Sequence, residues 1–297
     1  ISFPKSIAHA SLLLSDQKIL ERLVPENVLV IGRTTLSRST NNYIKSAKNL
    51  IVIDPRLSEI DSKREGNLLL VTLPAQVKSS KSDTSIWEQA SDIAAGVLAS
   101  IKWSEQLAII SICESLPDQS ALFVGSSRPV RDVEAFCHPR SGIEVFANRG
   151  LAGIDGNLST IFGIAREFQN TFAILGDLTF LHDISALTNA GSENIRIFVI
   201  DNNGGAIFST LPQAGVDNFD QLFGTPHNLD LAKVCAGFNV SVSSVSNITE
   251  LQDLLSKEVK GLEVVIVKVP TRQSNAEKLK EITQRVSSAV RIGINLA

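Results

Sequence analysis

Oxygen-bearing side chains stand directly after two apolar runs in the second half of the chain. Asp177 follows one run, and Asn202 follows the next, close to the pair Gly204-Gly205. Asp177 offers a carboxylate and Asn202 an amide oxygen, while adjacent glycines allow the backbone to approach a ligand closely. Oxygen ligands of this kind suit Mg²⁺, which usually completes its coordination shell with phosphate oxygens and water. The pattern therefore predicts a Mg²⁺ site that serves a phosphate-bearing ligand.

The same residues also fit a simpler interpretation as two ordinary turns. Asp177 would then cap the start of a helix, and Asn203-Gly204 would form a tight turn. Their position after strands favours the ligand site, because open α/β sheets bind ligands outside the carboxyl ends of their strands. The first amides of the helix expected after Asp177 would point to the same place, and amides at a helix start attract phosphate.

The runs before these residues belong to a regular alternation of strand and helix patterns. The strand patterns cover residues 121–124, 144–147, 171–175, 195–200, 239–243 and 262–269. The helix patterns cover residues 158–168, 178–190, 228–237, 248–257 and 275–291. Such alternation is typical of a doubly wound parallel sheet, so we predict an α/β fold for this part of the chain.

The first hundred residues show a shorter version of the same alternation. Apolar runs over 28–32, 50–55 and 68–73 predict buried strands, and residues 36–47 predict a partly helical stretch. These pieces resemble part of a Rossmann-type domain. The first run is followed only by Gly32 and not by a G-x-G-x-x-G string, so dinucleotide binding is not expected.

A Ser/Lys-rich stretch over 75–84 separates the two alternations and is typical of a solvated linker. Helix patterns follow over 86–100 and 105–116. We therefore divide the chain into a partial Rossmann-like domain with its linker, residues 1–100, and a second domain, residues 101–297.

Composition limits the function classes. Hydrophobic residues make up 43% of the chain, charged residues 20%, and the formal net charge is −3. This balance allows a sizeable core and gives no electrostatic reason to expect nucleic acid or an anionic membrane as a partner. No apolar run reaches the roughly 18 residues that a membrane span needs. The cysteines Cys113, Cys137 and Cys235 are scattered and odd in number, so we expect reduced thiols in a cytoplasmic protein.

Three longer strings resemble a known enzyme family. They are FANRGLAGIDG over 146–156, GDLTFLHD over 176–183 and NNGGAIFSTLP over 202–212. The Gly-Asp and Asn-Asn pairs resemble the diphosphate-binding motif of thiamine-diphosphate enzymes. The full strings resemble one family among them, the 2-succinyl-5-enolpyruvyl-6-hydroxy-3-cyclohexene-1-carboxylate (SEPHCHC) synthases, also called MenD. The resemblance is strong from Leu122 to Pro226 and weaker on either side.

The resemblance implies a role for each matching position. Asp177, Asn202 and the carbonyl group of Gly204 match the family's Mg²⁺ ligands. The positions that match contacts of thiamine diphosphate are Ile154, Gly176, Asp177, Leu178, Thr179, Asn202 and Gly204. The positions that match catalytic and substrate-binding residues are Ser127, Arg131, Arg149, Ile207, Phe208 and Leu211. Ile154 would hold the cofactor in its bent form, and the backbone amides of Leu178 and Thr179 would contact its diphosphate.

The activity that the resemblance implies is part of menaquinone biosynthesis. The family decarboxylates 2-oxoglutarate on thiamine diphosphate and adds the resulting carbanion to isochorismate. Both substrates are dicarboxylates, and arginine side chains bind carboxylates in a bidentate manner. Ser127, Arg131 and Arg149 would accordingly bind substrate carboxylates, whereas Arg128 and Arg140 are expected at the surface.

The family also implies features outside this chain. It works as a dimer or tetramer, and the glutamate that activates the cofactor lies on an N-terminal pyrimidine-binding domain of the partner subunit. Nothing in the sequence resembles that domain, so we expect the diphosphate half of a site and no activity from this chain alone. Two alternatives stay open: another thiamine-diphosphate enzyme, such as a 2-oxoacid decarboxylase or an acetolactate-type synthase, and a phosphate-binding relative without catalytic activity.

Overall fold

A computed structural model of the chain describes residues 6–32, 37–56, 66–75 and 83–296. The described residues separate into two compact units. The larger unit is formed mainly by Ile101–Ile282, and the smaller one by His9–Ser100 together with Thr283–Ala297. The long C-terminal helix α11 (Arg272–Gly293) therefore contributes residues to both units.

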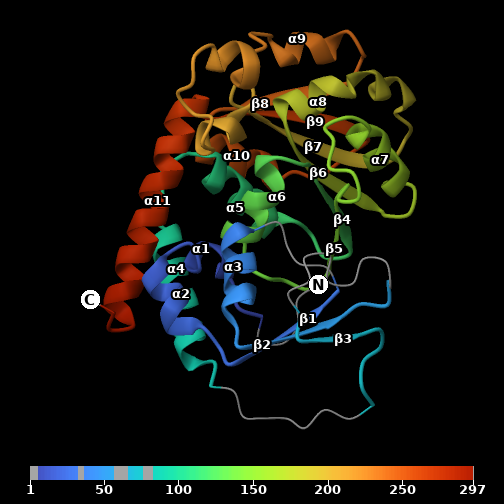
Figure 1. Ribbon diagram of the computed structural model, residues 1–297. Helices are drawn as coiled ribbons and strands as arrows, with labels where there is room; N and C mark the ends of the chain where they lie inside the picture. The colour runs from blue at the N-terminus through green and yellow to red at the C-terminus, as the bar shows by residue number, and fades with distance from the viewer. Residues whose placement is uncertain (1–5, 33–36, 57–65, 76–82, 297) are drawn as a thin grey trace. The chain divides into compact units, whose positions relative to one another are not determined.

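The larger unit contains a six-stranded sheet with the order β5-β4-β6-β7-β9-β8 (Figure 1). Its strands are β4 (Ser120–Val124), β5 (Ile143–Phe146), β6 (Asn170–Gly176), β7 (Asn194–Asp201), β8 (Ser241–Val245) and β9 (Leu262–Lys268). All neighbouring strands of this sheet run parallel. The α/β fold with a parallel sheet that the sequence predicts is thereby confirmed.

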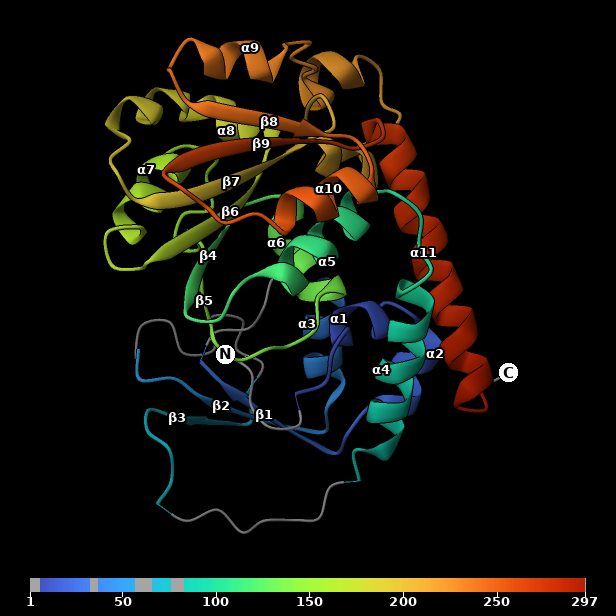
Figure 2. The same cartoon turned by 180° about the vertical axis from the view of Figure 1, so that it is seen from behind.

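Helices cover both faces of this sheet, which explains why its central strands are apolar at consecutive positions. Ile174 and Phe198 pack with α5 (Glu105–Ser115) and α10 (Ile248–Leu255) on one face. The neighbouring positions Ala173 and Val199 pack on the other face with α7 (Asn157–Ile164) and α9 (Leu231–Ala236). Figures 1 and 2 show these two helical layers on opposite sides of the strands. A strand buried on both faces needs a continuous apolar run rather than an alternating one.

Local signals fix the ends of several helices. The Ser104 hydroxyl accepts a hydrogen bond from the Leu107 amide and caps α5, and the Asn247 side chain caps α10 through the Glu250 amide. Such caps satisfy amides that have no partner within the helix. The other short elements of this unit are α6 (Arg128–Phe136), α8 (Asp177–His182), the 3₁₀ turns η1 (Ile184–Asn189) and η2 (Ala206–Thr210), and the π turn η3 (Asp220–Gly224).

The order of the strands creates a point where the winding of the chain reverses. From β4 the chain moves to β5 on one side, and it then returns to add β6 on the other side of β4. Loops that leave neighbouring strands in opposite directions open a crevice at their carboxyl ends, which is where α/β proteins bind ligands. The ends of β4, β6 and β7 therefore frame the place where a site is expected.

The smaller unit contains the three-stranded parallel sheet β1-β2-β3. Its elements are α1 (Ala10–Leu13), α2 (Gln17–Leu23), β1 (Asn27–Ile31), α3 (Arg38–Ser46), β2 (Asn49–Ile53), β3 (Leu68–Leu70) and α4 (Ser85–Leu98). Asp16 caps α2 and also pairs with Arg291 of α11. The Gln89 side chain donates to the carbonyl group of Gly293 at 2.9 Å. These contacts tie the end of α11 to the N-terminal helices of this unit.

The structure differs from the predicted elements in a few places. The helix predicted over 178–190 is two elements, because α8 ends at His182 and η1 begins at Ile184. The Asp183 carboxylate at this break accepts a hydrogen bond from the Ser159 amide at 2.8 Å. The helices α1, α2 and α6 have no counterpart among the predicted elements, and most of the predicted linker, residues 76–82, lies outside the described residues. Among the described helices, none is long and apolar enough to cross a membrane.

Candidate functional site

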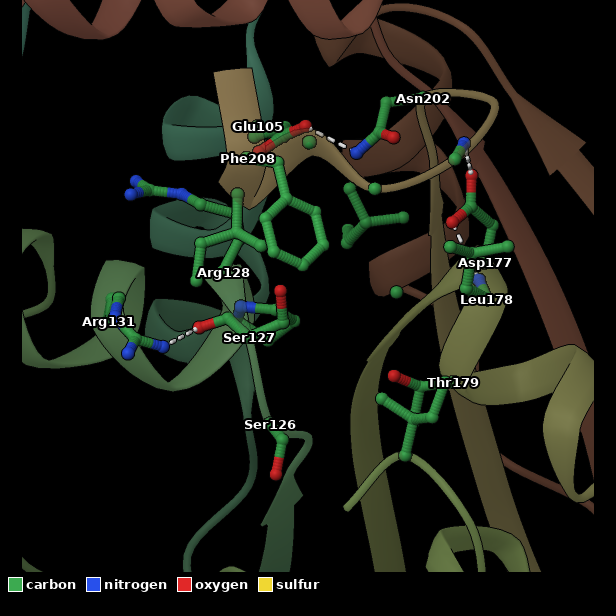
Figure 3. Close-up of a pocket in the computed structure, with 18 of the residues that line it drawn as sticks. Glu105, Ser126, Ser127, Arg128, Arg131, Asp177, Leu178, Thr179, Asn202 and Phe208 are labelled. Carbon is green, nitrogen blue, oxygen red and sulfur yellow. Dashed lines mark hydrogen bonds between the residues drawn. The ribbon is translucent and has the colours of Figure 1, made fainter. Parts of the chain in front are cut away.

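A cavity of about 360 Å³ lies in the crevice outside the carboxyl ends of β4, β6 and β7 (Figure 3). All of the predicted site residues except Leu211 line it. They are Ser127, Arg131, Arg149, Ile154, Gly176, Asp177, Leu178, Thr179, Asn202, Gly204, Ile207 and Phe208. The cavity also has lining residues that the sequence did not single out, among them Glu105, Ser126 and Arg128.

Asp177 is the first residue of α8 and stands directly after β6. Its side chain is buried, with 1% exposed. One carboxylate oxygen accepts a hydrogen bond from the Leu178 amide at 2.6 Å, and the other accepts from the Gly204 amide at 2.8 Å. The second bond joins the end of β6 to the loop after β7, so the two predicted halves of the motif meet.

Asn202 stands directly after β7 and is also buried. Its amide nitrogen donates to the Glu105 carboxylate at 2.6 Å, whereas its amide oxygen Oδ1 is buried and has no hydrogen-bond partner among the described residues. A buried oxygen without a partner is uncommon and needs an explanation. An oxygen-preferring cation held by Asp177 and Asn202 would provide one, so the residues present fit Mg²⁺.

Gly204 has a backbone conformation that only glycine adopts easily, with φ at +132°. A Cβ atom at this position would overlap the carbonyl oxygen of Gly224. The backbone of the loop after β7 therefore passes directly against the segment that contains η3. The Gly204 carbonyl accepts a hydrogen bond from the Ala206 amide at 2.9 Å.

Replacing Gly204 by alanine should weaken both the fold and metal binding. The obstacle is a backbone carbonyl that no rotamer change can move, and the positive φ adds strain, so we expect a loss of about 1–3 kcal/mol in stability. Urea denaturation and titration with Mg²⁺ and thiamine diphosphate measure the two effects. Gly163→Ala is the matched control, because a Cβ there meets nothing within 4 Å and φ is ordinary. Equal behaviour of the two variants would contradict this prediction.

Arginine side chains form the polar part of the cavity after β4. Arg131 donates to the backbone carbonyl of Ser127 at 2.6 Å, and Arg149 donates to the Ser126 hydroxyl at 3.4 Å. Burial lowers the pKa of Arg131, and the positive charges of Arg128 and Arg149 lower it further. Cations gathered in this way favour an anionic ligand.

Ser127 itself has an uncommon backbone conformation, with φ at 74°. It is the residue before α6, and the Arg131 guanidinium reaches back over the first turn of the helix to its carbonyl group. A residue held in such a conformation needs support from its surroundings and is often found in a binding site. The serine hydroxyl is thus presented to the cavity by a turn that Arg131 stabilises.

Arg128 corrects the sequence prediction, which placed it at the surface. Its side chain is 14% exposed and forms an ion pair with the fully buried Asp132, one helical turn further along α6. Asp132 also accepts a hydrogen bond from the Gln106 side chain at 3.4 Å. The spacing of Arg128 and Asp132 is that of facing residues on a helix, so a correct prediction of α6 would have revealed the pair. Arg140 lies outside the cavity and pairs with Asp118.

Glu105 was not predicted as a site residue either. It is the first residue of α5, its side chain is 2% exposed, and it lines the cavity. Burial raises the pKa of Glu105 to about 7, and the negative charge of Asp132 contributes to the rise, while Arg128 opposes it. A glutamate in the first turn of a helix is common at protein surfaces, so no local pattern signals its burial.

His227 is a further residue beside the site that the sequence does not single out. Its ring nitrogen Nε2 lies 3.3 Å from an Asp177 carboxylate oxygen and 3.6 Å from one of Asp201. The hydrogen bond to Asp177 raises the pKa of His227, and burial together with the charge of Asp177 raises the pKa of Asp201. The three side chains lie close enough to share one metal ion. No second histidine or cysteine stands at ligand spacing from His227 in the sequence, so spacing alone could not identify it.

The remaining lining is apolar. Ile154, Ile207 and Phe208 line the cavity, and the ring of Phe208 packs against that of Phe223 with centroids 5.5 Å apart. Leu211 is half-buried at the end of η2 and does not line the cavity. Its predicted role beside the cofactor stays a prediction, as do the predicted roles of the residues that do line the cavity.

Comparison with known proteins shows which class of protein this part of the chain resembles. Residues 131–269 match the family described as thiamine pyrophosphate enzyme, C-terminal TPP binding domain. This part of the chain is therefore similar to the C-terminal TPP binding domain of thiamine-pyrophosphate (thiamine-diphosphate) enzymes, and the site lies within it except for the segment before residue 131.

The curated relatives narrow the class further. The chain is 34% identical to the 2-succinyl-5-enolpyruvyl-6-hydroxy-3-cyclohexene-1-carboxylate synthase of Thermobifida fusca, over 94% of this chain and 53% of the relative. It is 30% identical to the synthase of the same name from Listeria innocua, over 94% and 52%. The synthase of that name from Trichodesmium erythraeum is 32% identical, over 85% and 47%. The predicted resemblance to SEPHCHC synthases is confirmed, and the chain spans about half the length of the curated relatives it matches.

Proposed function

We propose that the complete protein is a SEPHCHC synthase, which decarboxylates 2-oxoglutarate with thiamine diphosphate and Mg²⁺ and joins the remaining four-carbon unit to isochorismate. One observation carries this proposal: a Mg²⁺-type set of oxygen ligands and three arginine side chains border the same cavity at the reversal point of the sheet. The names of the relatives support the same activity.

Asp177, Asn202 and the Gly204 carbonyl would hold the Mg²⁺ ion, and the backbone at Leu178 and Thr179 would bind the diphosphate. Thiamine diphosphate supplies, when bound, the nucleophilic carbon and the electron sink that a decarboxylation needs. Asp177 would bring a carboxylate oxygen to the ion, and Asn202 would bring an amide oxygen that is already buried. The protein therefore binds and orients the cofactor through residues from two neighbouring strand ends.

The arginine side chains would bind the substrates. 2-Oxoglutarate and isochorismate each carry two carboxylates, and Arg131 and Arg149 with the Ser127 hydroxyl offer donors on one side of the cavity. The lowered pKa of Arg131 reflects its burial and the cations beside it, and a bound carboxylate would relieve the repulsion among those cations. On the other side, Ile154, Ile207 and Phe208 would exclude water from the reacting carbon.

Replacing Arg131 by glutamine tests the substrate assignment. Loss of a charged hydrogen bond of about 1.5–3 kcal/mol should raise the KM for 2-oxoglutarate roughly 10–100-fold. Carbon dioxide release by the full-length enzyme, with 2-oxoglutarate and with pyruvate, measures the effect. Arg140→Gln is the matched control, because Arg140 is bound to Asp118 outside the cavity. An enzyme that decarboxylates pyruvate in preference, or that does not consume isochorismate, would contradict the proposed activity.

The partners of the complete protein are part of the same proposal. We propose that it assembles as a dimer or tetramer and that a pyrimidine-binding domain completes the site with the activating glutamate. Sedimentation of the full-length protein tests the first statement. A monomer with full activity would contradict it.

A further inference from the structure

The amide of Asn202 has two chemically different ends, and only one of them can bind a metal ion. Its oxygen carries lone pairs, whereas its nitrogen is a donor only. A half-turn of the terminal bond exchanges the two ends with little change in shape. The proposed Mg²⁺ site therefore needs something that holds the oxygen, and not the nitrogen, toward the ion.

We propose that Glu105 is a positioning residue that fixes the Asn202 amide with its oxygen toward the metal ion. The Glu105 carboxylate accepts a hydrogen bond from the amide nitrogen at 2.6 Å. In Figure 3 the nitrogen of Asn202 points to Glu105 and the oxygen points the other way. If the amide were reversed, two oxygen atoms with no proton between them would meet at this distance, so the ionised carboxylate permits only one orientation. This inference rests on the proposed function. It extends the proposed Mg²⁺ site to a residue that would not contact the ion itself.

Glu105 is held rigidly enough for this task. Its backbone amide donates to the Asn275 side chain at 3.3 Å, and the preceding Ser104 caps α5. Its side chain is 2% exposed, so it has little freedom to turn away from Asn202. Residues behind metal ligands commonly fix the ligand's orientation in this way.

The surroundings of Glu105 also argue against a simple packing role. A buried carboxylate is costly, and an apolar side chain of similar size would fill the same space at lower cost. Asp132 lies near enough to repel it, and Arg128 near enough to attract it. Within the described residues, Asn202 is the only one for which a hydrogen bond to the Glu105 carboxylate is observed. Orientation of Asn202 is therefore the role that the contacts of Glu105 support.

The test is a double-mutant cycle in the full-length protein, read by calorimetric titration of Mg²⁺ at saturating thiamine diphosphate. Glu105→Leu should weaken Mg²⁺ binding about 10–100-fold, as changes behind a metal ligand usually do. In an Asn202→Asp background the same change should alter the dissociation constant less than about threefold or tighten binding, because a carboxylate has an oxygen at both ends. Equal losses in the two backgrounds, or no loss with asparagine present, would overturn the proposal.

Glu105→Gln provides a second measurement that does not depend on the aspartate variant. The glutamine oxygen can accept the same hydrogen bond from the Asn202 nitrogen. The glutamine nitrogen can instead donate to the Asn202 oxygen when the Asn202 amide is reversed. If the two orientations are equally populated, the dissociation constant should rise only about twofold. A loss as large as that of Glu105→Leu would mean that charge and not orientation matters, and would overturn the proposal. Glu114→Gln, at an exposed position of the same helix, is the matched control.

The same experiment separates this inference from the proposed function. If wild-type protein binds thiamine diphosphate without any dependence on Mg²⁺, the proposed function fails and the inference fails with it. If wild-type binding requires Mg²⁺ but the Glu105 variants lose affinity equally in both backgrounds, only the inference fails. Thermal unfolding of each variant without cofactor shows whether a loss of affinity reflects a loss of fold.

Discussion

Alanine in place of Asp177 should abolish the Mg²⁺-dependent binding of thiamine diphosphate to the full-length protein. Asp177 is the only carboxylate among the three predicted ligands. It also accepts the hydrogen bond from the Gly204 amide that joins the ends of β6 and β7. Changes behind a metal ligand cost roughly 10–100-fold in affinity, and removal of the ligand itself should cost more. Calorimetric titration of the cofactor, with Mg²⁺ and with a chelator present, measures the loss.

Asp253→Ala is the control for this experiment, because Asp253 is an exposed residue on α10 and lies outside the cavity. The control should bind as wild type does. Mg²⁺-dependent binding that survives in Asp177→Ala would mean that Gly176-Asp177 forms an ordinary turn before α8. The proposed function would then lose its central observation.

Replacement of Arg128 by methionine should destabilise the larger unit by about 3–5 kcal/mol, the usual cost of removing one partner of a buried ion pair. Asp132 is fully buried, and the methionine would leave its carboxylate without the cation that balances it. Urea denaturation followed by the fluorescence of Trp103, which lies in this unit, measures the loss in a Trp87→Phe background. Arg166→Met, at an exposed position of the same unit, should change the stability little.

The loss in Arg128→Met should also depend on pH in a defined direction. Burial raises the pKa of Asp132 in the folded protein above its ordinary value, and Arg128 opposes this rise. Without Arg128 the folded pKa should rise further. A carboxyl group whose pKa is higher in the folded than in the unfolded state stays protonated to higher pH in the folded protein. The free energy of unfolding therefore falls as pH rises above the pKa of the unfolded state. The destabilisation should therefore be larger at about pH 8 than at about pH 5, and the opposite trend would contradict the assignment.

The sheet and the motif could be predicted from the sequence because both depend on local patterns. β6 and β7 are buried on both faces, so each contains a continuous apolar run (172–175 and 197–200), and a polar residue follows the end of each strand. In a parallel sheet those polar residues must meet at one edge. The pattern of the sequence alone therefore places Asp177 and Asn202 together.

The rest of the site could not be predicted, because it depends on tertiary contacts. Glu105 and Arg128 are charged residues of the kind that normally face solvent, and only their buried partners Asn202 and Asp132 show otherwise. His227 lies on a loop that is far from Asp177 in the sequence, and the two side chains come together only in the folded protein. Leu211 is a different case: its position in a family-like string predicts a role beside the cofactor, it does not line this cavity, and its role stays a prediction.

The hydrogen bond from the Gly204 amide to Asp177 joins the two loops through atoms of the protein alone. The two loops that would bind the cofactor are thus fixed to each other by a contact that involves neither the ion nor the cofactor, so we expect little of the chain to become ordered on binding. The entropy lost on binding then comes mainly from immobilising the ion and the cofactor, and little of it comes from ordering the chain. We accordingly expect amide hydrogen exchange in the loops after β6 and β7 to be slow in the cofactor-free protein and to change little on loading.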